Sequence, residues 1–376
     1  MTALEVALLP AGSADAEIAA LLAACPESFA QQTPGWRDVI TGQGVDQALF
    51  LGCRVAGRLV GVLPGYRFEG PLGAILVSCA QAGPLGGIAC LRDAPRDAVY
   101  AELVSAFIAL ARERGCALAT LISNPIWPDR ERIERCMAPD YVLENVCQVL
   151  DLARALDADG EPAQASANVR RNLRRAREAG LVVDEAQSAT NVAEWYEIHA
   201  QRHREIGATP LPRGLFERAL ERAVPAGVAR FLFVRSADSG ELVAGGLYLQ
   251  HGAVIDALMP SIRSDAAPLR ANYLLALHSM QLAAARGARF YNWQGSPPGG
   301  GVHRFKMQWG SRDVGYAYLS RAVGDVSAFL ASTPAEIAHG YPWHYALPFD
   351  CVGGGAAGRR VGARASAWAS LEGGGS

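Results

Sequence analysis

The stretch GGGVHRFKMQWGSRD, residues 299–313, contains the only lysine of the 376-residue chain, Lys306. Lysine and arginine together number 35, so the other 34 are arginine. Lysine supplies a compact, mobile ammonium and arginine a wide planar fork, so a site shaped for one rejects the other. An ammonium aimed at a developing oxyanion stabilises it, typically by about 3 kcal/mol. Lys306 is therefore a candidate catalytic residue, with a surface lysine flanked by core aromatics as the alternative.

A carboxylate in an apolar strand is the second candidate. Asp256 interrupts the stretch AVIDALMPS, so it is either buried and functional or lies at a strand edge. A buried carboxylate needs a specific reason, and we interpret Asp256 as the base for an attacking amine. Further substrate-binding candidates, for which packing or capping is the alternative, are Tyr248, Tyr273, Gln294, His303 and Trp309.

An arginine-rich segment, SANVRRNLRRAREAG, spans residues 166–180. Ser166 can cap a helix here and Gly180 can end it. One acidic residue offsets five basic ones, so pairing within the helix does not explain the cluster. A solvated helix face is one interpretation, and a site for a phosphate-bearing donor is the other. The helix spacing places four of these side chains on one face: Arg170, Arg171, Arg174 and Arg175.

Composition excludes several classes of protein. A net charge of −2 argues against nucleic-acid binding over the whole surface. The eight cysteines lack metal-ligand or disulfide spacing, so we expect reduced, mostly buried thiols. His199 and His203 are one helical turn apart without a suitably placed carboxylate, so we expect packed or hydrogen-bonded histidines and no metal. With no basic leader and no run of 18 apolar residues, we expect a soluble cytoplasmic protein without membrane contact.

Two parts of the chain follow one plan. Each has a strand, a turn with glycine (Gly57, Gly240), two further strands, a helix ending at Arg-Gly (Gly115, Gly287) and a final strand. The order β-turn-β-β-α-β occurs twice. The repeat predicts an α/β protein with mixed sheets, built as two domains by duplication.

Several motifs together resemble the FemABX-like branch of the GNAT acyltransferase superfamily. They are NVRRNLRRAREAG, WYEIHAQRHREIG, GELVAGGLYL, ARGARFYNWQGS and HRFKMQWG, and the resemblance covers about residues 145–325. It implies two tandem GNAT-like domains, expected at 1–150 and 151–345, before a tail at 346–376 that we expect to be disordered. It also implies that Lys306 contacts the transferring ester or the donor phosphates and that Phe305 holds the terminal adenosine. We add the neighbouring Arg304 to the donor-binding candidates.

The resemblance implies transfer of an acyl group, often an aminoacyl group from charged tRNA, to an amine. CoA-dependent GNAT enzymes use a glycine-containing pyrophosphate loop, whereas this chain has RSDAAPLRANYLL at the corresponding place. We therefore expect charged tRNA as the donor substrate, no cofactor, and a small amine or peptide-like acceptor. Two alternatives stay open: an acyl-CoA-dependent N-acyltransferase with an atypical CoA site, and a non-catalytic tandem GNAT scaffold.

Overall fold

The computed structural model describes residues 4–41, 45–79, 85–342, 344–348 and 351–352. Residue contacts divide the chain into two compact units. The described part of unit 1 lies within residues 4–146 and 315–352, and the described part of unit 2 is Cys147–Val314. None of the helices within the described ranges has the length and apolar character needed to span a bilayer.

Unit 1 contains a mixed sheet with the strand order β1-β2-β3-β4-β6-β13, and β5 pairs with β3. Its strands are β1 (Leu4–Leu9), β2 (Gln47–Val55), β3 (Arg58–Gly70), β4 (Gly73–Val77), β5 (Ala89–Cys90), β6 (Cys116–Ile122) and β13 (Arg312–Ala322). Its helices are α1 (Asp15–Ala24), the 3-10 helix η1 (Ala30–Gln32), α2 (Pro34–Ile40), α3 (Arg96–Glu113), α4 (Arg130–Met137), α11 (Ser327–Ala331) and α12 (Pro334–Gly340).

Unit 2 contains a mixed sheet with the strand order β7-β12-β11-β10-β9-β8. Its strands are β7 (Tyr141–Asp151, of which the part from Cys147 onward lies in unit 2), β8 (Leu181–Asp184), β9 (Ala229–Ser236), β10 (Leu242–His251), β11 (Val254–Ile262) and β12 (Phe290–Asn292). Its helices are α5 (Leu152–Ala155), α6 (Ala167–Glu178), α7 (Ala189–Glu205), α8 (Arg213–Arg218), the π-helix η2 (Ala219–Ala223), the 3-10 helix η3 (Ser264–Leu269), α9 (Ala271–Ala285) and α10 (Gly301–Met307).

The predicted repeat is confirmed in the order of elements. Strands β2, β3 and β4, helix α3 and strand β6 correspond to β9, β10, β11, α9 and β12. In both copies the strand after the helix pairs in parallel with the strand before it. The four glycines of the plan have φ between 66° and 84°, a left-handed conformation that glycine adopts without steric cost. A strand and two helices also precede each copy, β1-α1-α2 and β8-α7-α8.

The strand that follows each copy in the sequence pairs in the unit of the other copy. The end of β7 pairs with β12 in unit 2, whereas β13 pairs with β6 in unit 1. Residues 315–345, which the sequence analysis assigns to the second domain, therefore group with unit 1. Within the expected tail, Ala346 and Leu347 are buried in the unit 1 core, while residues 353–376 lie outside the described residues.

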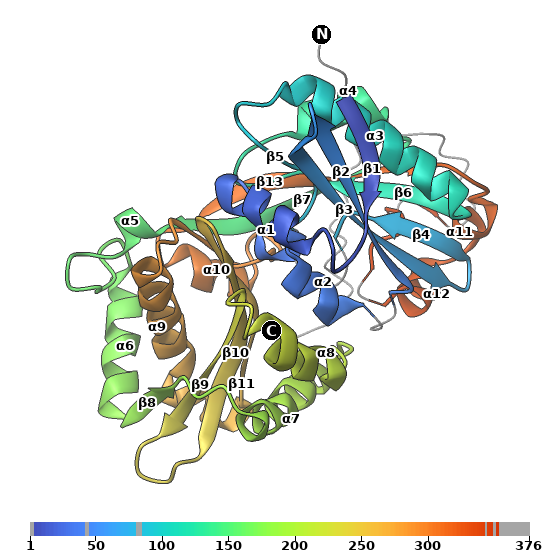
Figure 1. Ribbon diagram of the computed structural model, residues 1–376. Helices are drawn as coiled ribbons and strands as arrows, with labels where there is room; N and C mark the ends of the chain where they lie inside the picture. The colour runs from blue at the N-terminus through green and yellow to red at the C-terminus, as the bar shows by residue number, and fades with distance from the viewer. Residues whose placement is uncertain (1–3, 42–44, 80–84, 343, 349–350, 353–376) are drawn as a thin grey trace. The chain divides into compact units, whose positions relative to one another are not determined.

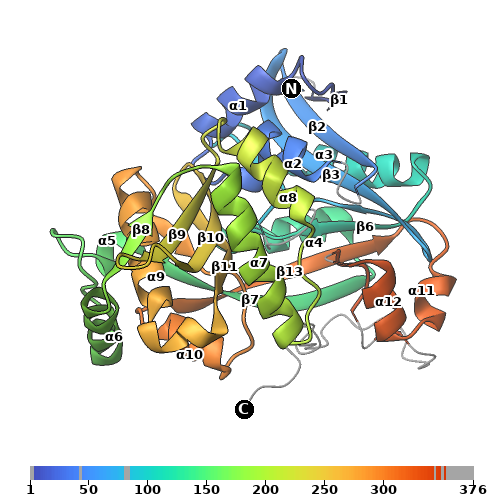
Figure 2. The ribbon, with the colours of Figure 1, turned by 90° about the horizontal axis from the view of Figure 1, so that it is seen from below.

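Helices cover both faces of the unit 2 sheet. Figure 1 shows α6 and α9 on one face and α7 with α8 on the other, and Figure 2 shows strands β9–β11 between α9 and α7. On the α7 face, Trp195 packs against Phe231 and Phe216. On the α9 face, Leu232, Val234 and Met280 belong to one buried cluster. Successive side chains of β9 point to opposite faces of the sheet, as they do in any strand, so Phe231 lies on the α7 face and Leu232 on the α9 face.

Six of the eight cysteines, all within the described residues, are buried, and none forms a disulfide. The expectation of mostly buried thiols is therefore confirmed.

Candidate active site

The two parallel strands of unit 2 separate after a short paired segment. The pairing runs from Val254 with Phe290 to Asp256 with Asn292, where β12 ends, while β11 continues to Ile262. In open α/β sheets, ligands bind in the crevice beyond the carboxyl ends of parallel strands. The point where β11 and β12 separate is therefore the place in unit 2 to look for chemistry.

Asp256 lies at this point and is 1% exposed. Strand β11 has neighbours on both sides, so Asp256 is buried and does not lie at a sheet edge. Its Oδ1 accepts a hydrogen bond from Asn292 Nδ2 at 3.1 Å and another from Gln294 Nε2. Gln294 has a φ of 66°, a rare conformation for a residue other than glycine, which turns the chain away from β12. Two amide groups therefore hold the buried carboxylate.

Lys306 lies near the end of α10 and is only 6% exposed, so it is not a surface lysine. Its Nζ donates to Gln294 O at 3.0 Å, to Gly295 O at 3.3 Å and to Gln148 Oε1 at 3.3 Å. Asp256 and Lys306 therefore share Gln294, the first through its side chain and the second through its backbone carbonyl. The two catalytic candidates from the sequence belong to one buried polar cluster.

The cluster includes residues that the sequence analysis missed. Gln148 on β7 is completely buried and accepts from Ser296 Oγ at 2.7 Å. Gln148 Nε2 donates to Asp313 Oδ1 at 2.9 Å, and Asp313 also contacts His303 Nε2 at 3.1 Å. A polar side chain within the apolar strand segment CQVL is the same signal that identified Asp256, and it predicts the burial of Gln148.

Three of the aromatic candidates, Phe305, Tyr273 and Trp309, pack together. Phe305 contacts Tyr273 and Trp293 with ring centroids 5.1 and 5.7 Å apart, and Trp309 lies 6.0 Å from Trp293. All four belong to, or pack against, one hydrophobic cluster. The packing alternative therefore describes Tyr273 and Trp309, and the position of Phe305 among these rings gives no direct support to an adenosine contact.

Tyr248 lies on the opposite face of the sheet from Asp256. It pairs across the strands with Ala257, whereas Asp256 pairs with Leu249, and directly paired residues point to the same face. Tyr248 is buried in the cluster beneath α9, and burial raises the pKa of its hydroxyl well above the ordinary value. The structure thus separates Tyr248 from the Lys306 cluster.

The arginine-rich helix forms as predicted, over Ala167–Glu178, with Ser166 Oγ accepting from Val169 N at 3.3 Å. Its apolar residues, such as Leu173, are buried. Its opposite side exposes Arg170, Arg171, Arg174 and Arg175, which we call the arginine face.

Few acceptors engage the arginine face. Arg171 donates to Asn168 Oδ1 at 2.6 Å, and Arg174 lies 3.7 Å from Glu178, both within the helix. Arg170 donates to the carbonyl of Ala165. The face therefore presents positive charge to solvent with one carboxylate partner among the described contacts.

Helix α6 is attached to the helix that carries Lys306. Ser166 N donates to Gln308 O at 2.8 Å, and Asn168 Nδ2 donates to Gln308 Oε1 at 2.7 Å. Arg304, exposed on α10, donates to Gly299 O. The start of the arginine-rich helix and the end of α10 are thus held together within unit 2.

The connection between β11 and α9 differs from a glycine-rich phosphate loop. It forms η3, and Arg270 follows with a φ of 63°. The amide of Ala266 donates to Arg263 O, and that of Arg270 donates to Ala267 O. These two backbone donors are already used within the loop, whereas a phosphate loop directs such donors to its ligand.

His199 is a packed histidine, as expected. Its Nε2 accepts from Leu211 N at 3.3 Å, so the proton lies on Nδ1, which faces Ser261 Oγ at 3.2 Å. Burial lowers its pKa to about 3, with a smaller contribution from the charge of His203. His203 Nδ1 donates to the carbonyl of His199 at 2.9 Å.

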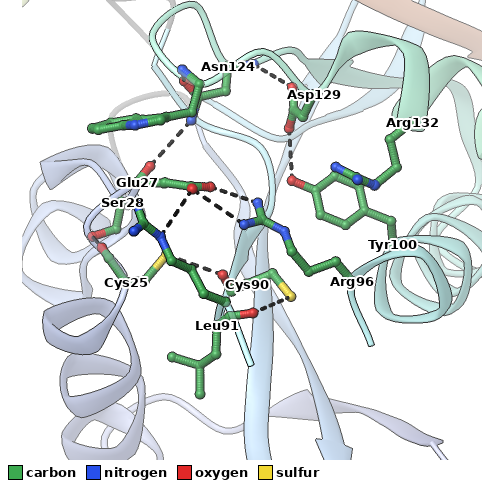
Figure 3. A network of polar contacts seen from close by, with 12 residues as sticks. Cys25, Glu27, Ser28, Cys90, Leu91, Arg96, Tyr100, Asn124, Asp129 and Arg132 are labelled. Carbon is green, nitrogen blue, oxygen red and sulfur yellow. Dashed lines mark hydrogen bonds and ion pairs between the residues drawn. The ribbon is translucent and has the colours of Figure 1, made fainter. Parts of the chain in front are cut away.

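Unit 1 has a separate polar network that no motif predicted (Figure 3). Asp129, at the start of α4, accepts from Asn124 N at 2.7 Å and from Tyr100 OH at 3.1 Å. Glu27 pairs with Arg96 at 2.7 Å and accepts from Asn124 Nδ2 through its carbonyl. Burial raises the pKa of Asp129 to about 6, although these hydrogen bonds oppose the increase.

Comparison with known proteins agrees with this architecture. Residues 163–307 match the family model described as an acetyltransferase (GNAT) domain. The second half of the chain is thus similar to a GNAT domain, and the chain has a fold of the GNAT type. With two copies of the plan in one chain, it has the FemABX-like tandem form of the GNAT fold.

Three solved structures illustrate the likeness. FemX has a TM-score of 0.67 at 13% identity, over 84% of this chain and 97% of its own. A tandem GNAT protein from the clavulanic acid biosynthesis pathway has a TM-score of 0.52 at 16% identity, over 86% and 99%. The C-terminal domain of a putative lysylphosphatidylglycerol synthetase from Agrobacterium fabrum has a TM-score of 0.55 at 12% identity, over 85% and 94%. No curated protein matches the sequence.

Proposed function

We propose that the protein is an aminoacyltransferase that moves an aminoacyl group from charged tRNA to an amine of a small molecule or peptide-like metabolite. The amine nitrogen attacks the ester carbonyl, the bond from that carbon to the ribose oxygen breaks, and an amide forms. Asp256 accepts the proton that the amine loses and returns it to the ribose oxygen, so the tRNA leaves with a free ribose hydroxyl. Lys306 stabilises the oxyanion of the tetrahedral intermediate.

The observation that carries the proposal is the buried cluster where β11 and β12 separate. Asp256 and Lys306 are both more than nine-tenths buried, and each holds part of Gln294. Charged groups in a site that excludes water act more strongly on developing charge than they do in water. An activated ester needs little more than an oxyanion donor and a base, and the cluster has a candidate for each.

The choice of RNA as donor rests on the arginine face. Four exposed arginines on a helix attached to α10 suit a ligand that carries several phosphates. The use of two amides of the β11–α9 loop within that loop argues against a standard CoA grip. FemX and the putative lysylphosphatidylglycerol synthetase share the fold, which is compatible with this assignment. The match to a family described as acetyltransferase favours acyl-CoA as the rival donor.

The experiment compares donors directly. The protein is incubated with total charged tRNA or with a set of acyl-CoA thioesters, each with a panel of amines, and amide products are detected by mass. We expect products only with charged tRNA, and none after treatment with RNase or after chemical deacylation of the tRNA. Lys306→Met serves as the matched inactive variant.

Formation of the same products from acyl-CoA, unaffected by RNase, would replace this proposal with the CoA-dependent one. If charged tRNA binds tightly and with equal affinity to the wild type and to Lys306→Met, but no amine of the panel gives a product, the result would favour the non-catalytic scaffold.

A further inference from the structure

The buried amide of Gln148 lies between a positive and a negative side chain. Its Oε1 accepts from Lys306 Nζ at 3.3 Å and from Ser296 Oγ at 2.7 Å. Its Nε2 donates to Asp313 Oδ1 at 2.9 Å and to Ser296 O at 3.4 Å. Four contacts fix the orientation of the amide, because a flip would place NH₂ against the ammonium and oxygen against the carboxylate.

Asp313 is itself held in place. His303 Nδ1 accepts from Gly299 N at 3.2 Å, so its ring proton lies on Nε2, which donates to Asp313. Burial acts to raise the pKa of Asp313, but the hydrogen bonds from Gln148 and His303 and the positive charge of Lys306 outweigh this effect, so the net shift of the pKa is downward. Asp313 is therefore ionised at neutral pH.

We propose that Gln148 is a positioning residue that orients the Lys306 ammonium, and that Asp313, held by His303, fixes Gln148. The inference rests on the proposed function for its catalytic consequence. The amide oxygen of Gln148 accepts a hydrogen bond from the ammonium and so sets the direction of that N–H bond. The carboxylate of Asp313 acts on Lys306 through this amide, since hydrogen bonds in a chain polarise one another.

Kinetics of two variants test the positioning role. Gln148→Met keeps the length of the side chain and removes its hydrogen bonds, so kcat should fall by up to about 100-fold, as expected for a misplaced group, with the donor KM nearly unchanged. Gln148→Glu places a carboxylate against the ammonium at neutral pH, and protonation restores a neutral acceptor. The ratio of its kcat to that of the wild type should therefore rise as pH falls.

Ser320→Ala in unit 1 is the matched control, because it removes one buried hydrogen bond, 2.8 Å long, to Thr120. A loss of kcat in the control equal to that in Gln148→Met, or a Gln148→Glu ratio independent of pH, would reduce Gln148 to a structural residue.

A second readout does not depend on activity. Lys306 is the only lysine, so protein labelled with ¹⁵N-lysine has a single side-chain ammonium resonance. In the wild type this signal should be protected from exchange with water, and in Gln148→Met it should shift and exchange faster, while Ser320→Ala leaves it unchanged. An ammonium signal unaffected by Gln148→Met overturns the positioning role, whether or not charged tRNA proves to be the donor.

Discussion

Replacing Lys306 by methionine separates its catalytic from its structural contribution. Gln294 O also accepts from Gln148 N at 3.3 Å, and Gln148 Oε1 accepts from Ser296 Oγ, so both keep a partner in the variant. Gly295 O loses its hydrogen bond from a charged donor, which costs about 2 kcal/mol. A domain stable by at least about 5 kcal/mol then stays about 99% folded. Turnover should nevertheless fall by about 100- to 1,000-fold, the effect of losing one oxyanion donor.

Lys306→Arg makes the test sharper. The three acceptors of Lys306 surround one nitrogen, whereas a guanidinium spreads its donors over a rigid plane. Arginine should therefore lose most of the turnover that methionine loses, although the charge remains. Steady-state kinetics with charged tRNA and thermal unfolding are measured together, with Ser320→Ala as the control for stability. Wild-type turnover in Lys306→Arg would refute the reasoning.

Three further predictions concern the donor, the base and the unit 1 network. Replacing the four arginines of the arginine face by glutamine should raise the donor KM and reduce the slope of log affinity against log salt concentration by about 3. The circular dichroism spectrum should not change. An unaltered slope would mean that the arginine face is an ordinary solvated helix face. Asp256→Asn keeps an oxygen at Oδ1 that accepts the same hydrogen bonds, so the variant should stay folded while kcat falls on the order of 100-fold. A kcat equal to that of the wild type would exclude Asp256 as the base. Asp129 has a folded pKa of about 6 against an ordinary 3.8, so its stabilising contribution is present below pH 3.8 and is lost as pH rises through about 6. Between pH 4 and pH 7.5, the free energy of unfolding of Asp129→Asn, measured with denaturant, should increase by up to about 3 kcal/mol relative to that of the wild type. If the free energies of the two proteins depend on pH in the same way, the prediction is wrong.

The elements and the two buried charges could be predicted from sequence because each leaves a local signal. Lys306 and Asp256 are chemical exceptions in their surroundings, and the glycine turns mark the repeat. The partners of Lys306 leave weaker signals or none: two are backbone carbonyls, which every residue has, and Gln148 is distant in sequence. The exchange of β7 and β13 is set by long-range pairing, which strand patterns do not encode. Phe305 illustrates the ambiguity of aromatic residues, since the same residue type serves stacking on a ligand and packing in a core.

Hydrogen exchange with a stable donor analogue tests the central claim most directly. The ligand is an RNA acceptor-stem hairpin whose 3′ end carries an amide-linked amino acid, and CoA is the parallel ligand. We predict that the hairpin protects amides in residues 166–178 and 294–307, that high salt abolishes this protection, and that CoA protects neither segment. Protection of these segments by CoA and not by the hairpin would contradict transfer from charged tRNA at the Lys306 cluster.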